Sequence, residues 1–87
     1  MTHSEAAIER RFVNLLTRWG FERGIKLLCH KYEVPGHRGY PDRMIMAEGA
    51  FVMFIEFKFP GYYPGELQLR RHATLRKMGF IVEVHDD

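Results

Sequence analysis

The stretch Phe51–Pro60, with the sequence FVMFIEFKFP, is typical of a buried β-strand. It is rich in aromatic and β-branched residues, and the Pro60–Gly61 pair ends it. Because successive side chains of a strand alternate between its faces, Glu56 and Lys58 project to the same face, about 7 Å apart. A charged pair within an apolar strand costs free energy unless the charges are paired or bind a ligand. The alternative interpretation is an edge strand with a solvated Glu/Lys face.

A hairpin partner is predicted immediately before this strand. Arg43–Ala47 is a short apolar strand, and Glu48–Gly49 is typical of a turn. Counting back from the turn places Asp42 opposite Glu56, within about one residue. Two carboxylates are then expected to lie side by side. The alternative for Asp42 is a Pro-Asp turn in which its side chain caps backbone N–H groups.

A helix is predicted for Ser4–Trp19. Ser4 is a suitable N-cap, and the acidic residues that follow it suit the positive end of the helix dipole. Glu5 and Glu9 lie within the apolar stripe of this helix rather than opposite it, so we expect a functional role for Glu5. For Glu9, a functional role and simple exposure to solvent both stay open. The stripe consists of Ile8, Phe12, Leu15, Leu16 and Trp19.

The rest of the chain completes an α-β-β-β-α-β order. Gly20 and Gly24 are expected to end the first helix and form a turn. We expect a central mixed sheet flanked by the two helices, with the Glu56/Lys58 face of the central strand directed toward the first helix and a cleft. The remaining strand, helix and strand are predicted at Ile25–Tyr32, Glu66–Met78 and Phe80–His85.

Length and composition indicate one small globular domain, residues 1–87, with 46% hydrophobic residues and a net charge of +2. No apolar run is long enough to span a membrane, and no secretory leader is visible. A single cysteine, Cys29, excludes an internal disulfide and suits a reducing compartment. These features predict a cytoplasmic protein. The positive charge weakly favours an anionic partner.

The paired carboxylates suggest metal chemistry on phosphate. Two carboxylates at a strand pair suit Mg²⁺, which usually takes one or two protein carboxylates and keeps several waters. A bound ion can activate water and stabilise charge on a phosphoryl oxygen. The Lys58 ammonium, two residues beyond Glu56, can orient that water or hold the phosphate. The backbone carbonyl of Phe57 can add an oxygen ligand.

These segments resemble the PD-(D/E)XK nucleases, and most closely the compact, stand-alone form of the VRR-NUC branch. The resemblance rests on Gly39–Arg43 (GYPDR), Ile55–Lys58 (IEFK) and the downstream Gln68, and it extends from Glu5 to the strand Gly79–Val82. It implies an α/β fold with a restriction-endonuclease-like core, in a protein of a bacterial or phage-infected cell.

The same resemblance implies a role for each site residue. Asp42 and Glu56 would bind Mg²⁺ or Mn²⁺, with the Phe57 carbonyl as a further ligand. Lys58 would assist the attacking water. Glu5 would reach the site from the first helix and contact the metal directly or through a bound water. Gln68 would enter from the second helix and orient water or phosphate.

The implied activity is hydrolysis of DNA phosphodiester bonds by a structure-selective endonuclease acting on Holliday junctions or other branched DNA. The alternatives are a nucleic-acid-binding module without hydrolysis on the same fold, and a small structural or interaction protein, such as a subunit of a larger assembly. Lys26 matches a basic position common in the family's first strand. The expected nucleic-acid contacts are Lys26, Arg38, Arg43, Arg70 and Arg71.

A homodimer is also predicted, as the resemblance to junction-resolving nucleases implies. A domain this small leaves apolar surface that association would cover. Trp19, Tyr62 and Tyr63 are aromatic residues of the kind enriched at interfaces. The alternative is that these side chains cover the core or stack on DNA.

Overall fold

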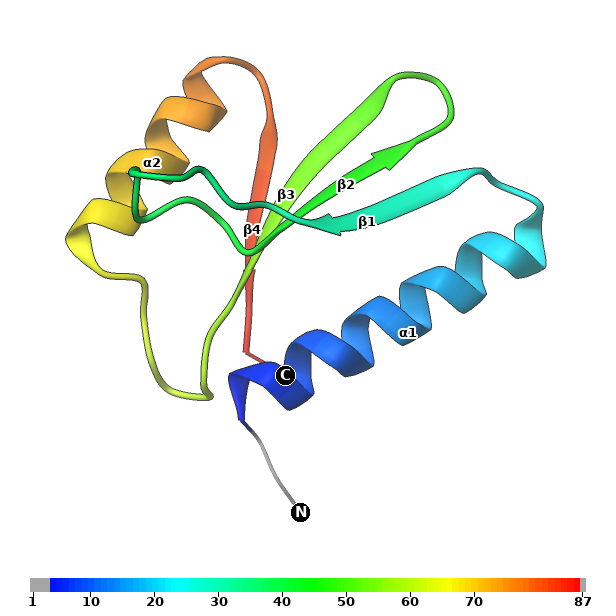
Figure 1. Ribbon diagram of the computed structural model, residues 1–87, viewed down its shortest axis with the longest axis horizontal. Helices are drawn as coiled ribbons and strands as arrows, with labels where there is room; N and C mark the ends of the chain where they lie inside the picture. The colour runs from blue at the N-terminus through cyan, green and yellow to red at the C-terminus, as the bar shows by residue number, and fades with distance from the viewer. Residues whose placement is uncertain (1–3, 87) are drawn as a thin grey trace.

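The computed structural model describes residues 4–86, which form a four-stranded sheet with a helix on each face (Figure 1). The elements follow the predicted order. They are α1 (Glu5–Arg23), β1 (Leu27–Lys31), β2 (Arg43–Ala47), β3 (Phe51–Phe57), α2 (Glu66–Lys77) and β4 (Ile81–His85).

The sheet is mixed, as predicted, with the strand order β1-β2-β3-β4. The β1–β2 and β2–β3 pairs are antiparallel, and β3–β4 is parallel. A parallel pair requires a crossover connection, which α2 provides. Because β3 lies between two neighbours, the interpretation of this strand as an edge strand is wrong.

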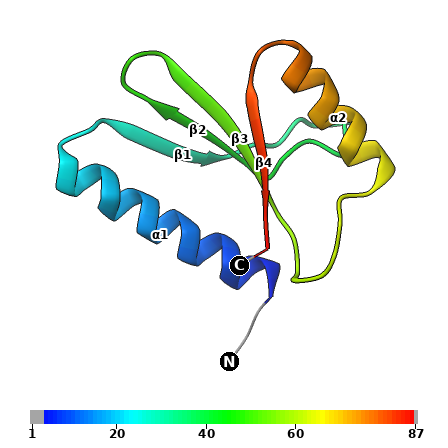
Figure 2. The ribbon, with the colours of Figure 1, turned by 180° about the vertical axis from the view of Figure 1, so that it is seen from behind.

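The two faces of the sheet bury separate hydrophobic clusters. On one face, Ile8 of α1 packs on Ile45 and on Ile55 and Phe57 of β3. On the other face, Leu75 of α2 packs with buried residues of β3 and β4. Figure 2 shows the same arrangement from behind, with the sheet between the two helices. Odd-numbered residues of β3 therefore face α1, and even-numbered residues face α2.

This arrangement corrects the predicted orientation of the central strand. The Glu56 side chain contacts His72 of α2, so the Glu56/Lys58 face looks toward α2 and not toward α1. The strand also ends at Phe57, three residues earlier than predicted, although the Lys58 N–H still donates to the His85 carbonyl. Lys58 therefore lies just past the end of β3.

Helix α1 begins as predicted but ends later. The Ser4 hydroxyl accepts a hydrogen bond from the Ala7 N–H at 3.1 Å, as an N-cap should. The helix continues through Gly20 to Arg23, and Gly24, with φ 65°, provides the left-handed cap. A Cβ at Gly20 would lie 3.4 Å from the Ile25 carbonyl oxygen, so this glycine permits close packing rather than ending the helix.

Among residues 4–86, neither helix combines the length and the apolar character needed to cross a membrane.

Candidate active site

Asp42 lies beside the end of the β2–β3 hairpin. Arg43 pairs with Ile55, so Asp42 and Glu56 are the next residues beyond this pair, as the predicted register has them. The Asp42 carboxylate accepts a hydrogen bond from the Phe57 N–H at 2.7 Å. Asp42 therefore does cap a backbone N–H, but on the neighbouring strand, and this bond holds its carboxylate beside the end of β3.

Burial is the largest cause that raises the pKa of Asp42. The hydrogen bond from Phe57 opposes this shift, whereas the carboxylates of Glu56, Glu9 and Glu5 reinforce it. Asp42 is nevertheless exposed by surface area, so solvent screens much of both the burial effect and the repulsion. Negative charges from α1 and β3 thus converge on Asp42.

Glu56 is buried at the centre of the site, with 1% of its surface exposed. Its Oε1 lies 2.8 Å from Nε2 of His72, which is itself fully buried. Its Oε2 lies 3.2 Å from the Lys58 ammonium, an ion pair that lacks the alignment of a hydrogen bond. Within residues 4–86, Glu56 Oε2 and His72 Nδ1 are the buried side-chain atoms without a hydrogen-bond partner.

His72 is the site residue that the sequence interpretation missed. It lies three residues before the buried Leu75, on the same face of α2, and therefore at a core-facing position. A polar imidazole at such a position is one signal that could have identified it, since buried polar groups are usually paired.

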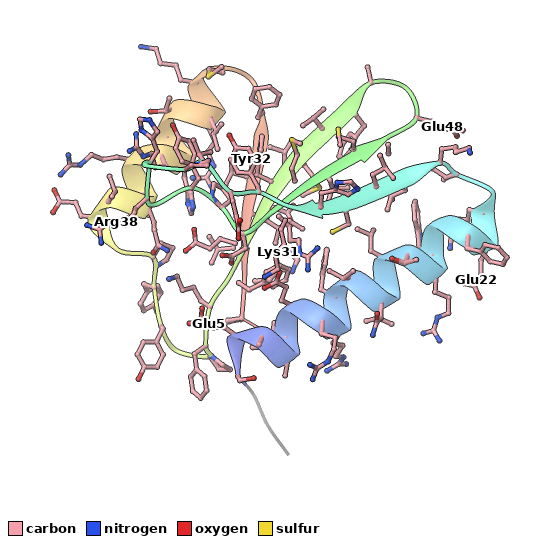
Figure 3. All side chains as sticks on the ribbon, viewed as in Figure 1. Glu5, Glu22, Lys31, Tyr32, Arg38 and Glu48 are labelled. Carbon is pink, nitrogen blue, oxygen red and sulfur yellow. The ribbon has the colours of Figure 1, made fainter. Side chains whose placement is uncertain are left out.

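Glu5 and Gln68 lie at the starts of the two helices. Glu5 is exposed in the first turn of α1, at the end of the helix nearest Lys31 and away from Glu22 (Figure 3). Its carboxylate lies near enough to raise the pKa of Asp42. Gln68 Oε1 accepts a hydrogen bond from the Gly65 N–H at 2.8 Å, so this side chain caps α2. Its role toward water or phosphate stays a prediction.

Glu9 and Arg43 pair with one another between α1 and β2. The Arg43 Nε donates to Glu9 Oε2 at 2.6 Å, and its guanidinium also donates to the Cys29 carbonyl at 3.2 Å. Both side chains are mostly buried. Arg43 therefore joins elements of the fold rather than extending into solvent, and Glu9 is its partner.

The other predicted nucleic-acid contacts differ in position. Arg71 stacks on Tyr40 and donates to the Arg38 carbonyl at 3.0 Å, whereas Arg70 forms an exposed ion pair with Glu66. Lys26 lies before β1, at the opposite end of that strand from Lys31, about 16 Å away by strand geometry. The structure thus brings the Arg38 loop and α2 together but leaves Lys26 apart.

Comparisons with known proteins point to one family. A protein of Acyrthosiphon pisum secondary endosymbiont phage 1, named "Putative nuclease p44", is 38% identical over 82 residues, covering 94% of this chain and 82% of the phage protein. A solved structure described as a VRR_NUC domain matches with a TM-score of 0.64 and 28% identity, over 82% of this chain and 80% of that one.

The chain belongs to the VRR-NUC family. The match to a VRR-NUC structure confirms the restriction-endonuclease-like fold. No model of a known protein family matches the sequence.

The VRR-NUC fold implies a divalent cation, and the donors of this site fit one. Within the part of the chain that the structure describes, no three His, Cys, Asp or Glu side chains gather into a metal cluster. However, Mg²⁺ usually takes only one or two protein carboxylates. Asp42 and Glu56 supply two hard oxygen donors, and the unsatisfied Glu56 Oε2 is a buried acceptor that a cation would occupy. The Phe57 carbonyl as a further ligand stays a prediction.

The raised pKa of Asp42 predicts that Asp42→Asn stabilises the fold. A raised carboxyl pKa contributes stability below the ordinary value of 3.8, and this contribution is lost as the pH rises through the folded-state pKa. Asparagine keeps the acceptor for Phe57 and removes the repulsion. A screened interaction contributes about 0.2–1 kcal/mol, so we expect the variant's Tm to rise by about 1–8 °C at neutral pH.

Thermal unfolding in chelator from acidic to neutral pH would measure this effect. The gain should disappear at acidic pH, and the exposed control Glu22→Gln should show none. A Tm for Asp42→Asn below that of the wild type at neutral pH would contradict the account of this carboxylate.

Proposed function

We propose that this chain is an endonuclease that hydrolyses DNA phosphodiester bonds with the help of Mg²⁺ or Mn²⁺. The observation that carries the proposal is that Asp42 and Glu56 directly follow the Arg43–Ile55 pair, with the Lys58 ammonium 3.2 Å from Glu56 Oε2. Family membership supports the same activity.

Each side chain has a separate part in the reaction. Asp42 and Glu56 would hold the cation, which when bound supplies positive charge to a phosphoryl oxygen and lowers the pKa of water. Lys58 orients the attacking water and stabilises negative charge that develops on the phosphate. The water oxygen gives up one proton to solvent and forms a new bond to phosphorus, one ester P–O bond breaks, and the leaving oxygen takes up a proton from solvent.

We further propose that the enzyme prefers branched DNA, such as flaps and Holliday junctions. The test is a panel of end-labelled flap, nicked, junction and linear duplex substrates at one salt concentration with Mg²⁺. Wild-type protein should cut branched substrates faster, and Asp42→Asn should cut none. Equal cutting of linear duplex would exclude a preference for branched DNA but would still support nuclease activity. Binding without any cutting would support the nucleic-acid-binding module without hydrolysis.

A basic surface next to the site suits the DNA backbone. A hollow of about 290 Å³ beside the Glu9–Arg43 pair is lined by Arg10 and Lys31, among others. Figure 3 shows Arg38 beside α2, the helix that carries Arg70. Cations on both sides of the carboxylates would contact phosphates, which supply most of the sequence-independent affinity for DNA.

DNA affinity should therefore fall with salt, and the slope should report the contacts of single residues. Each phosphate contact contributes about 0.9 to the slope of log K against log salt for duplex DNA. Arg38→Ala and Arg70→Ala should each reduce the slope by about this amount. Arg18→Ala is the matched control, since Arg18 lies about 20 Å along α1 from Glu5. Affinity that is flat with salt would refute this contact surface.

We propose a homodimer as the active form. The second half of α1 exposes Leu15 and Trp19, which line shallow apolar hollows together with Phe12 and Leu16. Between α1 and the sheet, a neighbouring apolar cavity of about 460 Å³ includes Trp19 and Phe51 in its wall. A second copy of the chain would cover this surface and set two sites toward one branched substrate.

Light scattering at micromolar concentration should give about twice the 10.3 kDa mass of one chain. Leu15→Glu should yield monomers, because it places a charge in the proposed interface. Phe21→Glu, at a position 86% exposed elsewhere on α1, should remain dimeric. A wild-type monomer that cuts junctions at full rate would exclude the dimer as the active form.

A further inference from the structure

His72 lies where it can control which oxygen of Glu56 binds a cation. It is 0% exposed on the face of α2 that packs against β3, and its Nε2 lies 2.8 Å from Glu56 Oε1. The facing atom is a carboxylate oxygen, which accepts hydrogen bonds when ionised, so the ring donates through Nε2. One of the two Glu56 oxygens is therefore already engaged by the protein.

The other oxygen is in a different state. Glu56 Oε2 is buried and makes no hydrogen bond within residues 4–86, and the Lys58 ammonium lies 3.2 Å away. The two oxygens of one carboxylate thus differ: Oε1 is held by a side chain of α2, and Oε2 is buried beside the Lys58 ammonium without a hydrogen bond among the described residues. A hydrogen bond from a rigid ring also fixes the rotation of the carboxylate plane.

We propose that His72 is a positioning residue that leaves only Oε2 of Glu56 for the cation, and that the site thereby favours Mg²⁺ over Ca²⁺. This inference rests on the proposed function. Mg²⁺ requires a nearly ideal octahedral shell of single oxygen donors, whereas Ca²⁺ accepts six to eight oxygens and readily takes both oxygens of a carboxylate. A donor held on Oε1 disfavours the two-oxygen mode.

A purely structural role for His72 makes a different prediction. If the imidazole only filled space beneath the sheet, replacing it would change stability but would not change the relative affinities of two cations. The ratio of Mg²⁺ to Ca²⁺ affinity therefore separates positioning of Glu56 from packing.

The test is calorimetric titration of the DNA-free protein with Mg²⁺, with Mn²⁺ and with Ca²⁺, for the wild type, His72→Gln and His72→Leu. Glutamine keeps a side-chain N–H donor, whereas leucine fills similar space without one. His72→Leu should bind Mg²⁺ about 10–100-fold more weakly and lose the preference over Ca²⁺. His72→Gln should keep the wild-type preference. His72→Met serves as a second apolar variant if His72→Leu does not fold, which thermal unfolding in chelator would report.

The outcomes distinguish this inference from the function on which it rests. Wild-type protein that binds neither Mg²⁺ nor Mn²⁺ would overturn both. Wild-type protein that binds Mg²⁺, together with a folded apolar variant that keeps the same Mg²⁺ to Ca²⁺ ratio, would overturn the positioning role alone. A wild type that binds Ca²⁺ more tightly than Mg²⁺ would also overturn it, whatever the variants show.

Discussion

Lys58→Ala should abolish DNA cleavage and leave cation binding nearly unchanged. The Lys58 ammonium lies 3.2 Å from Glu56 Oε2 and is mostly buried, at the point where β3 ends. Removing one group that stabilises developing charge typically reduces kcat by about 100- to 1000-fold. Lys58 is not a ligand, since an ammonium has no lone pair to offer a cation.

Single-turnover cleavage and calorimetry on the same preparation would test this separation. Lys58→Arg keeps the charge but presents a broader, planar group, so we expect only partial activity. Lys77→Ala is the matched control, because Lys77 is an exposed residue in the last turn of α2, outside both the site and the proposed DNA surface. Loss of Mg²⁺ binding in Lys58→Ala would mean that the lysine organises the carboxylates rather than the water.

Glu56→Gln should lose both cation binding and cleavage while retaining the fold. Glutamine keeps the length of the side chain and an oxygen that accepts from His72 Nε2, but it removes the negative charge that the cation requires. Glu56→Ala should lose the same two properties. It should also be less stable than Glu56→Gln by about 1–3 kcal/mol, because the buried imidazole N–H is left without an acceptor.

Thermal unfolding with and without Mg²⁺ measures both effects at once. A ligand at about 100 times its Kd stabilises a protein by about 2.7 kcal/mol, so Mg²⁺ should raise the Tm of the wild type and of neither variant. A Tm increase of wild-type size in Glu56→Gln would show that the cation binds elsewhere.

The relative position of Asp42 and Glu56 could be predicted from the sequence because it depends on short-range geometry. Alternating side chains and a short hairpin turn determine the register of neighbouring strands. The observed register of β2 with β3 agrees with that expectation.

The identity of the facing helix could not be predicted in the same way. Strand alternation shows that Glu56 and Lys58 share a face, but the crossover of α2 between β3 and β4 decides which helix covers that face. His72 was missed for the same reason, since its partner comes from a strand 16 residues earlier. Its polar ring also interrupts the apolar pattern that identifies buried helix positions.

Gly20 and Arg43 show how tertiary packing overrides local signals. A glycine often ends a helix, but Gly20 lies within α1 because the helix packs closely on Ile25 and Leu27 there. Arg43 follows the Pro-Asp turn and was expected to face phosphate. It instead pairs with Glu9, whose place on the apolar stripe of α1 becomes understandable once this partner is known.

The measurement that tests the central claim most directly is cleavage of a labelled DNA junction by protein freed of metal with a chelator and then given back Mg²⁺ or Mn²⁺. We predict no product in the chelated sample, recovery of cutting when either ion is restored, and no product with Asp42→Asn under any condition. Cutting that continues in excess chelator, or that is equally fast in Asp42→Asn, would contradict the assignment of the Asp42–Glu56 pair as the cation site of a DNA endonuclease.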